Sequence, residues 1–183
     1  PFGSHEKLFG TNPIAFAWPR PNDSPVVFDM ATAAMAMGDV QIAARDGKTV
    51  PEGTGLNADG NETTDPSEII KGMLLPFGGY KGSHIAMMIE LLAGPLVGET
   101  TSFHSQKRDS GDGGPPRGGQ FILAINPELL SAGNWHNESE AFLDRLSHLD
   151  GTRLPGQRRY QNRLNLGPRE INTELLKTIA AAK

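Results

Sequence analysis

The chain has 183 residues, of which 37% are hydrophobic and 21% charged, and it carries a formal net charge of −4. This composition is typical of a globular protein and excludes an intrinsically disordered chain. An acidic chain without a basic patch is not expected to bind nucleic acid. Cysteine is absent, which excludes disulfides and thiolate metal sites and suits the reducing cytoplasm, where we expect the protein to reside. No apolar run is long enough to span a bilayer, so we expect no membrane contact.

Two short apolar runs near the start predict β-strands. Residues 14–18 read Ile-Ala-Phe-Ala-Trp and end before Pro19, and residues 26–28 read Val-Val-Phe and end before Asp29. Pro, Asn and Asp residues, which favour turns, separate the two runs. The pattern predicts a hairpin or two neighbouring strands.

The region after these strands predicts a weak helix and then a surface excursion. Residues 30–44 are rich in Ala and Met, which favours a helix, although Gly38 weakens it and Thr32 is a candidate N-cap. Residues 48–68 are polar and rich in turn residues, so we expect them on the surface. A short helix is expected after Ser67, which is its candidate N-cap.

A glycine-rich stretch, Leu-Pro-Phe-Gly-Gly-Tyr-Lys-Gly at residues 75–82, separates an apolar run from a helical pattern at residues 85–96. Strand, glycine turn and helix is an arrangement that holds phosphate groups, because glycines allow close approach and a helix N-terminus carries partial positive charge. The order Lys-Gly-Ser differs from a P-loop, and no Gly-x-Gly-x-x-Gly motif follows a strand. Two interpretations stay open: a phosphate cradle that uses Lys81, and a tight turn with an exposed lysine.

The second half of the chain predicts a loop, a strand and two helices. Residues 104–119 are rich in Gly and Pro, which predicts a loop, and residues 120–125 alternate weakly, which predicts a strand. Residues 138–149 place apolar side chains on one helical face. A break at Leu-Pro-Gly, residues 154–156, precedes a last amphipathic helix at residues 170–182 with Asn172 or Thr173 as its N-cap.

Titratable residues offer two candidates for chemistry. None of the five histidines lies at metal-ligand spacing from another ligand, so no metal site is expected. Asp29 and Asp39 each adjoin an apolar stretch, where an ionised carboxylate is costly unless it is paired. Each is either a helix cap or salt-bridge partner, or a carboxylate that orients a catalytic acid or base. Periodicity does not distinguish these interpretations.

Three stretches in this order resemble the malate/L-lactate dehydrogenase family in its non-Rossmann form. They are Gly-Thr-Asn-Pro-Ile-Ala-Phe at residues 10–16, Val-Phe-Asp-Met-Ala-Thr at residues 27–32 and the glycine-rich stretch at residues 75–82. Residues 38–45 and 154–160 give a narrower resemblance to the Δ1-piperideine-2-carboxylate/Δ1-pyrroline-2-carboxylate reductase branch. The resemblance implies a mixed α/β fold, layered and non-Rossmann, in which helices flank a mixed sheet. It also implies an NAD or NADP cofactor and a homodimer.

The resemblance assigns roles to three groups of residues. Asp39 is implied as the catalytic group that supports the proton-donating histidine, and Met37 and Gly38 as substrate contacts. Positive charge for a pyrophosphate or a 2′-phosphate comes from Lys81 and two arginines. The implied cofactor contacts are Val27, Phe28, Asp29, Tyr80, Lys81, Gly156, Gln157, Arg158 and Arg159.

The activity implied by the resemblance is NAD(P)H-dependent reduction of a cyclic imino acid by hydride transfer. A malate/L-lactate-type 2-hydroxyacid dehydrogenase is the alternative, because Met37 and Ala33 stand where relatives often carry His and Ser. The small-molecule substrate is therefore an imino or a keto acid, and the choice between NAD and NADP also stays open.

The family's N-terminal Ser-His-Gly motif has no counterpart in this sequence. We therefore expect a fragment that is inactive alone, and an inactive cofactor-binding or dimerisation module is a second alternative. Residues 1–150 are expected to form a cofactor-binding domain that is incomplete at its N-terminus. Residues 151–183 are expected to pack on the missing N-terminal helical domain.

Overall fold

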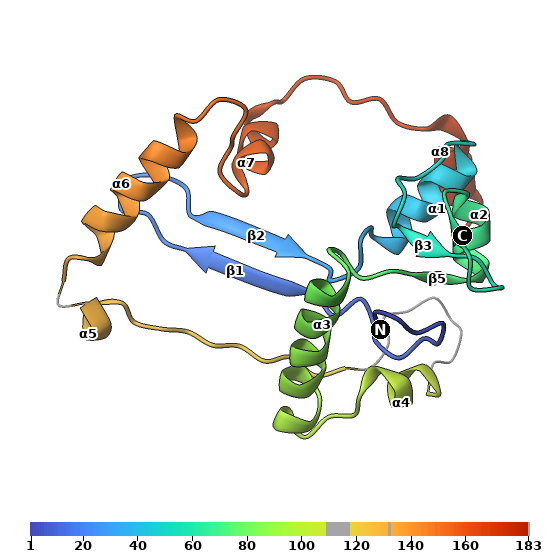
Figure 1. Cartoon of the computed structure of the whole chain (residues 1–183). Helices are drawn as coiled ribbons and strands as arrows, with labels where there is room; N and C mark the ends of the chain where they lie inside the picture. The colour runs from blue at the N-terminus through green and yellow to red at the C-terminus, as the bar shows by residue number, and fades with distance from the viewer. Residues whose placement is uncertain (109–117, 132, 183) are drawn as a thin grey trace. The chain divides into compact units, whose positions relative to one another are not determined.

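The computed structural model describes residues 1–108, 118–131 and 133–182. The chain forms two compact units, and Figure 1 labels most of their helices and strands. The first unit comprises Pro1–Phe16 and Phe28–Leu130, and the second comprises Ala17–Val27 and Ser131–Lys183. The expected domain boundary at residue 150 stays a prediction.

The two N-terminal strands are present and paired, as the sequence predicts. β1 spans Ile14–Trp18 and β2 spans Val26–Met30, and they form a two-stranded sheet with opposite strand directions (Figure 1). The Phe16 and Phe28 rings stack with their centroids 5.4 Å apart. Aromatic pairs of this kind stabilise the pairing of neighbouring strands.

A small antiparallel sheet in the first unit includes part of the expected surface excursion. In the order β4-β3-β5, its strands are Glu62–Thr63, Gly55–Leu56 and Met73–Leu74. Leu56 is buried, and a Cβ on Gly55 would lie 2.6 Å from the Ile69 side chain, so β3 lies against the core. Most of residues 48–68 are exposed or half-buried, as expected, whereas Gly55 and Leu56 are buried in a strand that the sequence pattern does not predict. Strands of two residues are too short to leave a periodic pattern.

Helices α1 (Met37–Arg45) and α2 (Pro66–Lys71) pack against each other in the first unit. Val40, Val50 and Ile69 form a buried cluster there, and Val40 and Ile69 have no exposed surface. Full burial of such a side chain stabilises by about 1.5–3 kcal/mol. This cluster therefore holds α1, α2 and the segment around Val50, which precedes β3, together.

Both helices begin at a different residue from the one predicted. Only the second half of the predicted first helix forms, because α1 begins at Met37. Thr32 does not cap it, since its hydroxyl donates to the Thr11 carbonyl oxygen. Asp65, rather than Ser67, caps α2, and its carboxylate accepts a hydrogen bond from the Ser67 amide at 2.8 Å. For α1, the tertiary hydrogen bond of Thr32 overrides the local pattern. For α2, Asp65 is a better N-cap than Ser67.

Helix α3 spans Tyr80–Ala93 and begins earlier than predicted, directly at the glycine-rich stretch. A 3₁₀ turn at Pro95–Val97 and helix α4 at Ser102–Gln106 follow it. α4 occupies the start of the region predicted as a loop, and residues 109–117 of that prediction lie outside the described residues.

Residues 120–125 form neither helix nor strand, so the predicted strand is wrong for the described chain. A strand needs a neighbour for its backbone hydrogen bonds, and no described segment pairs with this one. Ile122 and Leu123 are 83% and 70% exposed. The apolar composition therefore marks an exposed segment, which is followed by the short helix α5 at Glu128–Ser131.

The described part of the second unit contains an apolar cluster and a series of helices, and the last two of these helices have no buried residues. Val26, Leu143 and Leu154 are its buried members, and Trp18 and Leu146 pack against them. The helices are α6 (Trp135–Ser147), α7 (Gln157–Leu164) and α8 (Thr173–Ala181).

Two of these helices confirm the sequence prediction. α6 and α8 occupy the predicted regions, and the Asn172 side chain caps α8 by accepting from the amides of Glu174 and Leu175. The sequence pattern does not predict α7, because Gln-Arg-Arg-Tyr-Gln-Asn-Arg-Leu has no apolar periodicity.

Candidate functional site

Backbone hydrogen bonds in the first unit join three stretches that lie far apart in the sequence. Thr32 stands at the junction, where it is 2% exposed. Its amide and its hydroxyl both donate to the Thr11 carbonyl oxygen, at 2.9 and 3.0 Å, and its carbonyl oxygen accepts from the Phe77 amide at 3.0 Å. The segment after β2 is therefore fixed between an N-terminal turn, residues 10–13, and a glycine-rich turn, residues 77–82.

The glycine-rich turn depends on its glycines. Gly78 and Gly79 have φ angles of +57° and +63°, where residues with a Cβ are strained. A Cβ on Gly82 would lie 2.1 Å from the Phe77 carbonyl oxygen, which accepts from the Gly82 amide at 3.1 Å. A Cβ on Gly78 would meet nothing within 4 Å. The turn is therefore tightly packed at Gly82 and open at Gly78.

Tyr80 and Lys81 occupy the first turn of α3, and both side chains are exposed. The Tyr80 ring lies edge-on to the Phe2 ring at 6.2 Å and to the His84 ring at 5.7 Å. The Phe2 amide donates to Ser83 Oγ at 3.1 Å, which ties the start of the chain to this helix. The aromatic ring is thus oriented by its neighbours and still accessible, with a solvated cation beside it.

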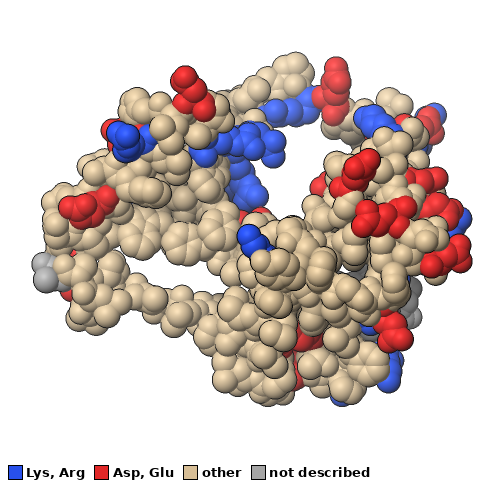
Figure 2. All heavy atoms as spheres, viewed as in Figure 1, with Lys and Arg blue, Asp and Glu red and all other residues tan. Residues whose placement is uncertain are grey.

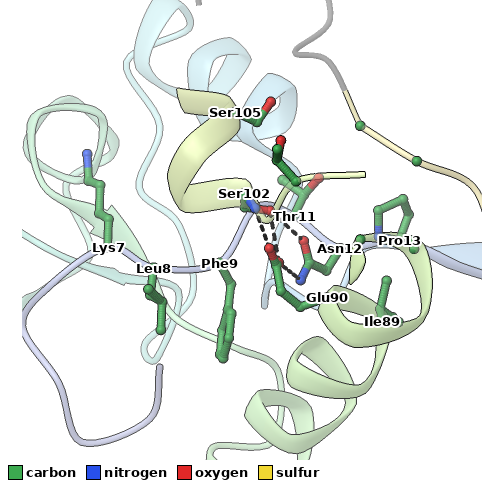
Figure 3. Close-up of a pocket in the computed structure, with 16 residues that line it drawn as sticks. Lys7, Leu8, Phe9, Thr11, Asn12, Pro13, Ile89, Glu90, Ser102 and Ser105 are labelled. Atoms are coloured by element: carbon green, nitrogen blue, oxygen red, sulfur yellow. Dashed lines mark hydrogen bonds between the residues drawn. The ribbon is translucent and has the colours of Figure 1, made fainter. Parts of the chain in front are cut away.

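A cavity of about 420 Å³ lies beside the N-terminal turn (Figure 3). Asn12 is buried at its edge, and its Nδ2 donates to Glu90 Oε2 at 2.7 Å and to the Ala86 carbonyl oxygen at 2.9 Å. The Ser102 hydroxyl donates to the same carboxylate oxygen at 2.9 Å. The polar lining of the cavity includes Lys7, Thr11, Asn12, Glu90, Thr100 and Ser102.

A smaller cavity of about 220 Å³ in the same unit brings the predicted substrate residue Met37 next to two of the motifs. Thr32, Ala33 and residues 73–76 line it together with Met37. The Met37 side chain also packs against the buried cluster of α1 and α2. Gly38, the second predicted substrate contact, is exposed in the first turn of α1.

The two aspartates singled out in the sequence are both exposed. Asp29 lies in β2, and Asp39 lies in the first turn of α1, where a carboxylate interacts favourably with the helix dipole. The expectation that an apolar environment makes their charges costly is therefore wrong, because both carboxylates reach solvent. The supporting role of Asp39 in catalysis stays a prediction.

In the second unit, two of the predicted cofactor contacts lie side by side. Gly156 precedes α7 with a φ of +86°, and a Cβ on it would lie 3.1 Å from the Val27 carbonyl oxygen. The Val27 amide donates to the Pro155 carbonyl oxygen at 3.4 Å. The Tyr160 hydroxyl donates to the Pro25 carbonyl oxygen at 3.0 Å. These bonds hold the start of α7 against the segment that enters β2.

Positive side chains gather over α7, as Figure 2 shows for the Lys and Arg atoms. Arg158 and Arg159 follow Gln157 in the first turn of this helix, and all three are exposed. The Arg163 guanidinium lies 5.9 Å from the centroid of the Tyr160 ring. The positive end of a helix dipole and two guanidinium groups favour an anion at this position.

An ion pair fixes the loop between β1 and β2 to α6 in the second unit. Arg20 Nη2 lies 2.7 Å from Glu140 Oε2, and Arg20 Nη1 lies 2.7 Å from Asp23 Oδ2. The hydrogen bond from Arg20 lowers the pKa of the Glu140 carboxyl below its ordinary value, although burial opposes the shift. This pair therefore contributes to the framework of the second unit rather than to a binding site.

Within the described parts of the chain, no cluster of three or more His, Asp or Glu side chains could hold a metal ion. The helices in those parts are also too short or too polar to cross a membrane. Within the first unit, the described residues bring together polar groups of the N-terminal turn and the glycine-rich turn. The polar groups at the start of α7 belong to the second unit and are considered by themselves.

The sequence pattern misses the residues that hold the first unit's motifs together. Thr32 is interpreted from the sequence as a helix cap, and Thr11 and Asn12 only as part of the motif at residues 10–16, yet all three join the motifs. Glu90 gives a usable signal, because it interrupts an otherwise apolar helical run. A carboxylate in that position needs hydrogen-bond partners.

The chain matches the family model described as malate/L-lactate dehydrogenase over residues 1–177, and it belongs to that family. The Δ1-pyrroline-2-carboxylate reductase of Ancylobacter novellus is 47% identical over 167 residues, which cover 89% of this chain and 49% of that protein. The Δ1-pyrroline-2-carboxylate/Δ1-piperideine-2-carboxylate reductase of Pseudomonas aeruginosa is 45% identical over 166 residues, with the same coverage of 89% and 49%.

A solved structure shows the same relationship. The Δ1-piperideine-2-carboxylate reductase from Pseudomonas syringae pvar. tomato superposes with a TM-score of 0.84 at 45% identity, covering 90% of this chain and 50% of that one. The predicted family and the predicted mixed α/β, malate/L-lactate dehydrogenase-like fold are confirmed. The chain spans about half the length of the curated relatives that it matches.

Proposed function

We propose that the protein is an NAD(P)H-dependent reductase of a cyclic imino acid, Δ1-pyrroline-2-carboxylate or Δ1-piperideine-2-carboxylate. The observation that carries the proposal is the junction at Thr32, which holds the three family motifs of the first unit in one arrangement. Relatives with these reductase names are 47% and 45% identical to the chain. Because the chain spans about half of their length, the activity is proposed for the whole protein.

The residues of the first unit fit a nicotinamide cofactor. The open side of the glycine-rich turn at Gly78 permits close approach, the Tyr80 ring offers a stacking surface and Lys81 offers a positive charge. Phe28 and Asp29, in the segment that leads to Thr32, are proposed as further contacts. When bound, the nicotinamide supplies the hydride for the reduction.

The start of α7 is proposed to contact a phosphate group of the cofactor. Gly156, Gln157 and the adjoining Val27 bring backbone groups to this position, and Arg158 and Arg159 bring guanidinium groups that pair well with phosphate. A contact with a 2′-phosphate would favour NADP over NAD. This proposal for the second unit is independent of the proposal for the first and has its own test below.

The first turn of α1 and the smaller cavity are proposed to serve the substrate. Met37 lines that cavity and would contact the apolar part of the substrate, with Gly38 beside it. Asp39 is exposed and free of a burial cost, so its carboxylate can accept a hydrogen bond from a proton-donating group and orient it. Its proposed role is to hold that donor while the imine nitrogen takes up a proton.

A 2-hydroxyacid dehydrogenase of the malate/L-lactate type is the second candidate, because the family model carries that description. Both reactions involve hydride transfer at a carbon next to a carboxylate, so the same cofactor contacts serve either. A third candidate is a cofactor-binding or dimerisation module without activity. Assembly as a homodimer and a cytoplasmic location are proposed for all three.

The test is a comparison of substrates with the purified protein. The oxidation of NADPH and of NADH is followed with Δ1-pyrroline-2-carboxylate, Δ1-piperideine-2-carboxylate, pyruvate and oxaloacetate. We expect faster turnover of the cyclic imino acids. Faster turnover of the keto acids would overturn the imine proposal in favour of the dehydrogenase, and cofactor binding without any turnover would support the inactive module.

A further inference from the structure

Glu90 on α3 is the centre of a hydrogen-bond network that none of the roles above uses. Its carboxylate accepts from Asn12 Nδ2 at 2.7 Å, from Ser102 Oγ at 2.9 Å and from the Ser102 amide. Figure 3 shows the Glu90 side chain pointing from α3 towards both residues. A carboxylate has about four acceptor positions. Most of the capacity of Glu90 is therefore used within the protein, which argues against Glu90 as a ligand-binding group of the adjacent cavity.

Asn12 holds an unusual backbone conformation at the N-terminal turn. Its φ is +38°, a region that costs a residue with a Cβ about 1 kcal/mol and that Asn tolerates better than most. Its side chain is 8% exposed and donates both to Glu90 and to the Ala86 carbonyl oxygen. Both acceptors belong to α3, so Asn12 attaches the N-terminal turn to that helix.

The network returns to α3 through the glycine-rich turn. Thr11, the neighbour of Asn12, accepts both hydrogen bonds of Thr32, and Thr32 accepts from the Phe77 amide. The Phe77 carbonyl oxygen in turn accepts from the Gly82 amide in the first turn of α3. The contacts form a closed ring that begins and ends on one helix. Its members in order are Glu90, Asn12, Thr11, Thr32, Phe77 and Gly82.

We propose that Glu90 is a positioning residue for the cofactor contacts at the glycine-rich turn. It acts through Asn12 and Thr32 and does not itself touch the cofactor. Loss of its charged acceptor leaves the buried Asn12 amide group with one partner fewer, and hydrogen bonds to charged groups are among the stronger ones. The turn that presents Tyr80 and Lys81 then loses part of its support. The inference rests on the proposed function, because it concerns cofactor binding.

The network could instead support only the local fold around α3 and α4. Such a structural role predicts lower stability of the protein without a specific change at the glycine-rich turn. The two roles therefore differ in the backbone amides that lose protection and in the affinity for the dinucleotide, and both quantities can be measured without turnover.

The test compares Glu90→Gln with Glu62→Gln, a matched change of charge at an exposed carboxylate of β4. Fluorescence titration of the purified protein gives the Kd values for NADPH and NADH, and hydrogen exchange reports on the Thr32 and Phe77 amides. We expect Glu90→Gln to raise the cofactor Kd about tenfold and to speed exchange at both amides. Glu62→Gln should change neither quantity.

A milder variant covers the case in which Glu90→Gln does not fold. Ser102→Ala removes one hydrogen-bond donor to Glu90 and keeps the carboxylate. It should therefore raise the cofactor Kd and speed exchange at the Thr32 and Phe77 amides, each by less than Glu90→Gln does. Unchanged affinity in folded Glu90→Gln or Ser102→Ala, with or without faster exchange, would overturn the positioning role. A wild-type protein that binds neither dinucleotide would overturn the proposed function, whereas the exchange comparison would still decide whether Glu90 holds the ring together.

Discussion

The glycine-rich turn of the first unit and the start of α7 in the second unit are locally similar but differently supported. Each places a glycine with positive φ directly before a helix whose first turn carries a cationic side chain. The glycine-rich turn is bound at Phe77 to the buried Thr32 and at Gly82 to its own helix. The start of α7 is held by the 3.4 Å bond between Val27 and Pro155 and by the Tyr160 hydroxyl on the Pro25 carbonyl oxygen, and α7 has no buried residue. Residues outside the local motif therefore decide how firmly such a motif is held.

The largest expected effect is a loss of stability when Gly82 of the glycine-rich turn is replaced. Gly82→Ala places a Cβ 2.1 Å from the Phe77 carbonyl oxygen, so the backbone must move and the free energy of unfolding should fall by about 3 kcal/mol. The matched change Gly38→Ala enters open space in α1 and should be neutral or stabilise by up to about 1 kcal/mol. Chemical denaturation measures both variants. Equal stabilities would show that the glycine-rich turn is not tightly held.

The cofactor affinity of two variants should distinguish the glycine-rich turn from the start of α7. Lys81→Ala should raise the Kd for NADPH and for NADH about tenfold, as expected for loss of a charge-assisted contact on a fixed turn. Arg158→Ala should raise it only about threefold, because the neighbouring Arg159 keeps a guanidinium group at the same helix end. A larger effect of Arg158→Ala on NADPH than on NADH would identify a contact with the 2′-phosphate. If Lys81→Ala raises the KM values of cofactor and substrate equally, Lys81 is not a cofactor contact.

Removal of the Thr32 hydroxyl tests whether Thr32 is the buried junction between the motifs. Thr32→Val keeps the shape of the side chain and removes its bond to the Thr11 carbonyl oxygen, which should lower the free energy of unfolding by about 1 kcal/mol. Thr178→Val removes a comparable bond to the Glu174 carbonyl oxygen at the surface of α8 and should cost much less. Thermal unfolding of the two variants is the measurement. A larger loss in Thr178→Val would contradict the assignment of Thr32 as the buried junction.

The smallest effect concerns the Arg20–Glu140 pair of the second unit. The pKa of Glu140 is lower in the folded than in the unfolded chain, so its contribution to stability is present at neutral pH. That contribution is lost as the pH falls through the lowered pKa and Glu140 becomes protonated. The difference in unfolding free energy between wild type and Glu140→Gln should therefore shrink in acid. A difference that does not change with pH would mean that the pair contributes no charge interaction.

The sequence predicts those parts of the fold that local patterns determine. The apolar runs and turn residues around β1 and β2, and the apolar face of α6, are local signals, and these elements form as predicted. The glycine-rich stretch is also found by its composition, and it leads into α3 as a helix-starting turn should. The roles of its Tyr80 and Lys81 in cofactor binding stay predictions.

The remaining features depend on partners that are distant in the sequence. Thr32 resembles a helix cap until its bond to Thr11, 21 residues away, is known. β3 and β5 are too short for a periodic pattern and exist because their backbones pair with each other. Residues 120–125 show the reverse case, since an apolar segment without a neighbour does not become a strand. Backbone hydrogen bonds of this kind leave no side-chain pattern to detect.

The ring of hydrogen bonds that begins and ends on α3 has a consequence for folding. We expect it to set the stage of folding at which the glycine-rich turn reaches its native conformation. Asn12 and Glu90 are 78 residues apart in the chain. Contacts across such a separation form slowly, because the entropy of a long loop must be lost before the contact stabilises anything. Helix α3 can form early from local contacts, whereas the turn before it acquires its final shape only after the N-terminal turn has docked. We therefore expect the glycine-rich turn to be among the last parts of the first unit to become fixed during folding.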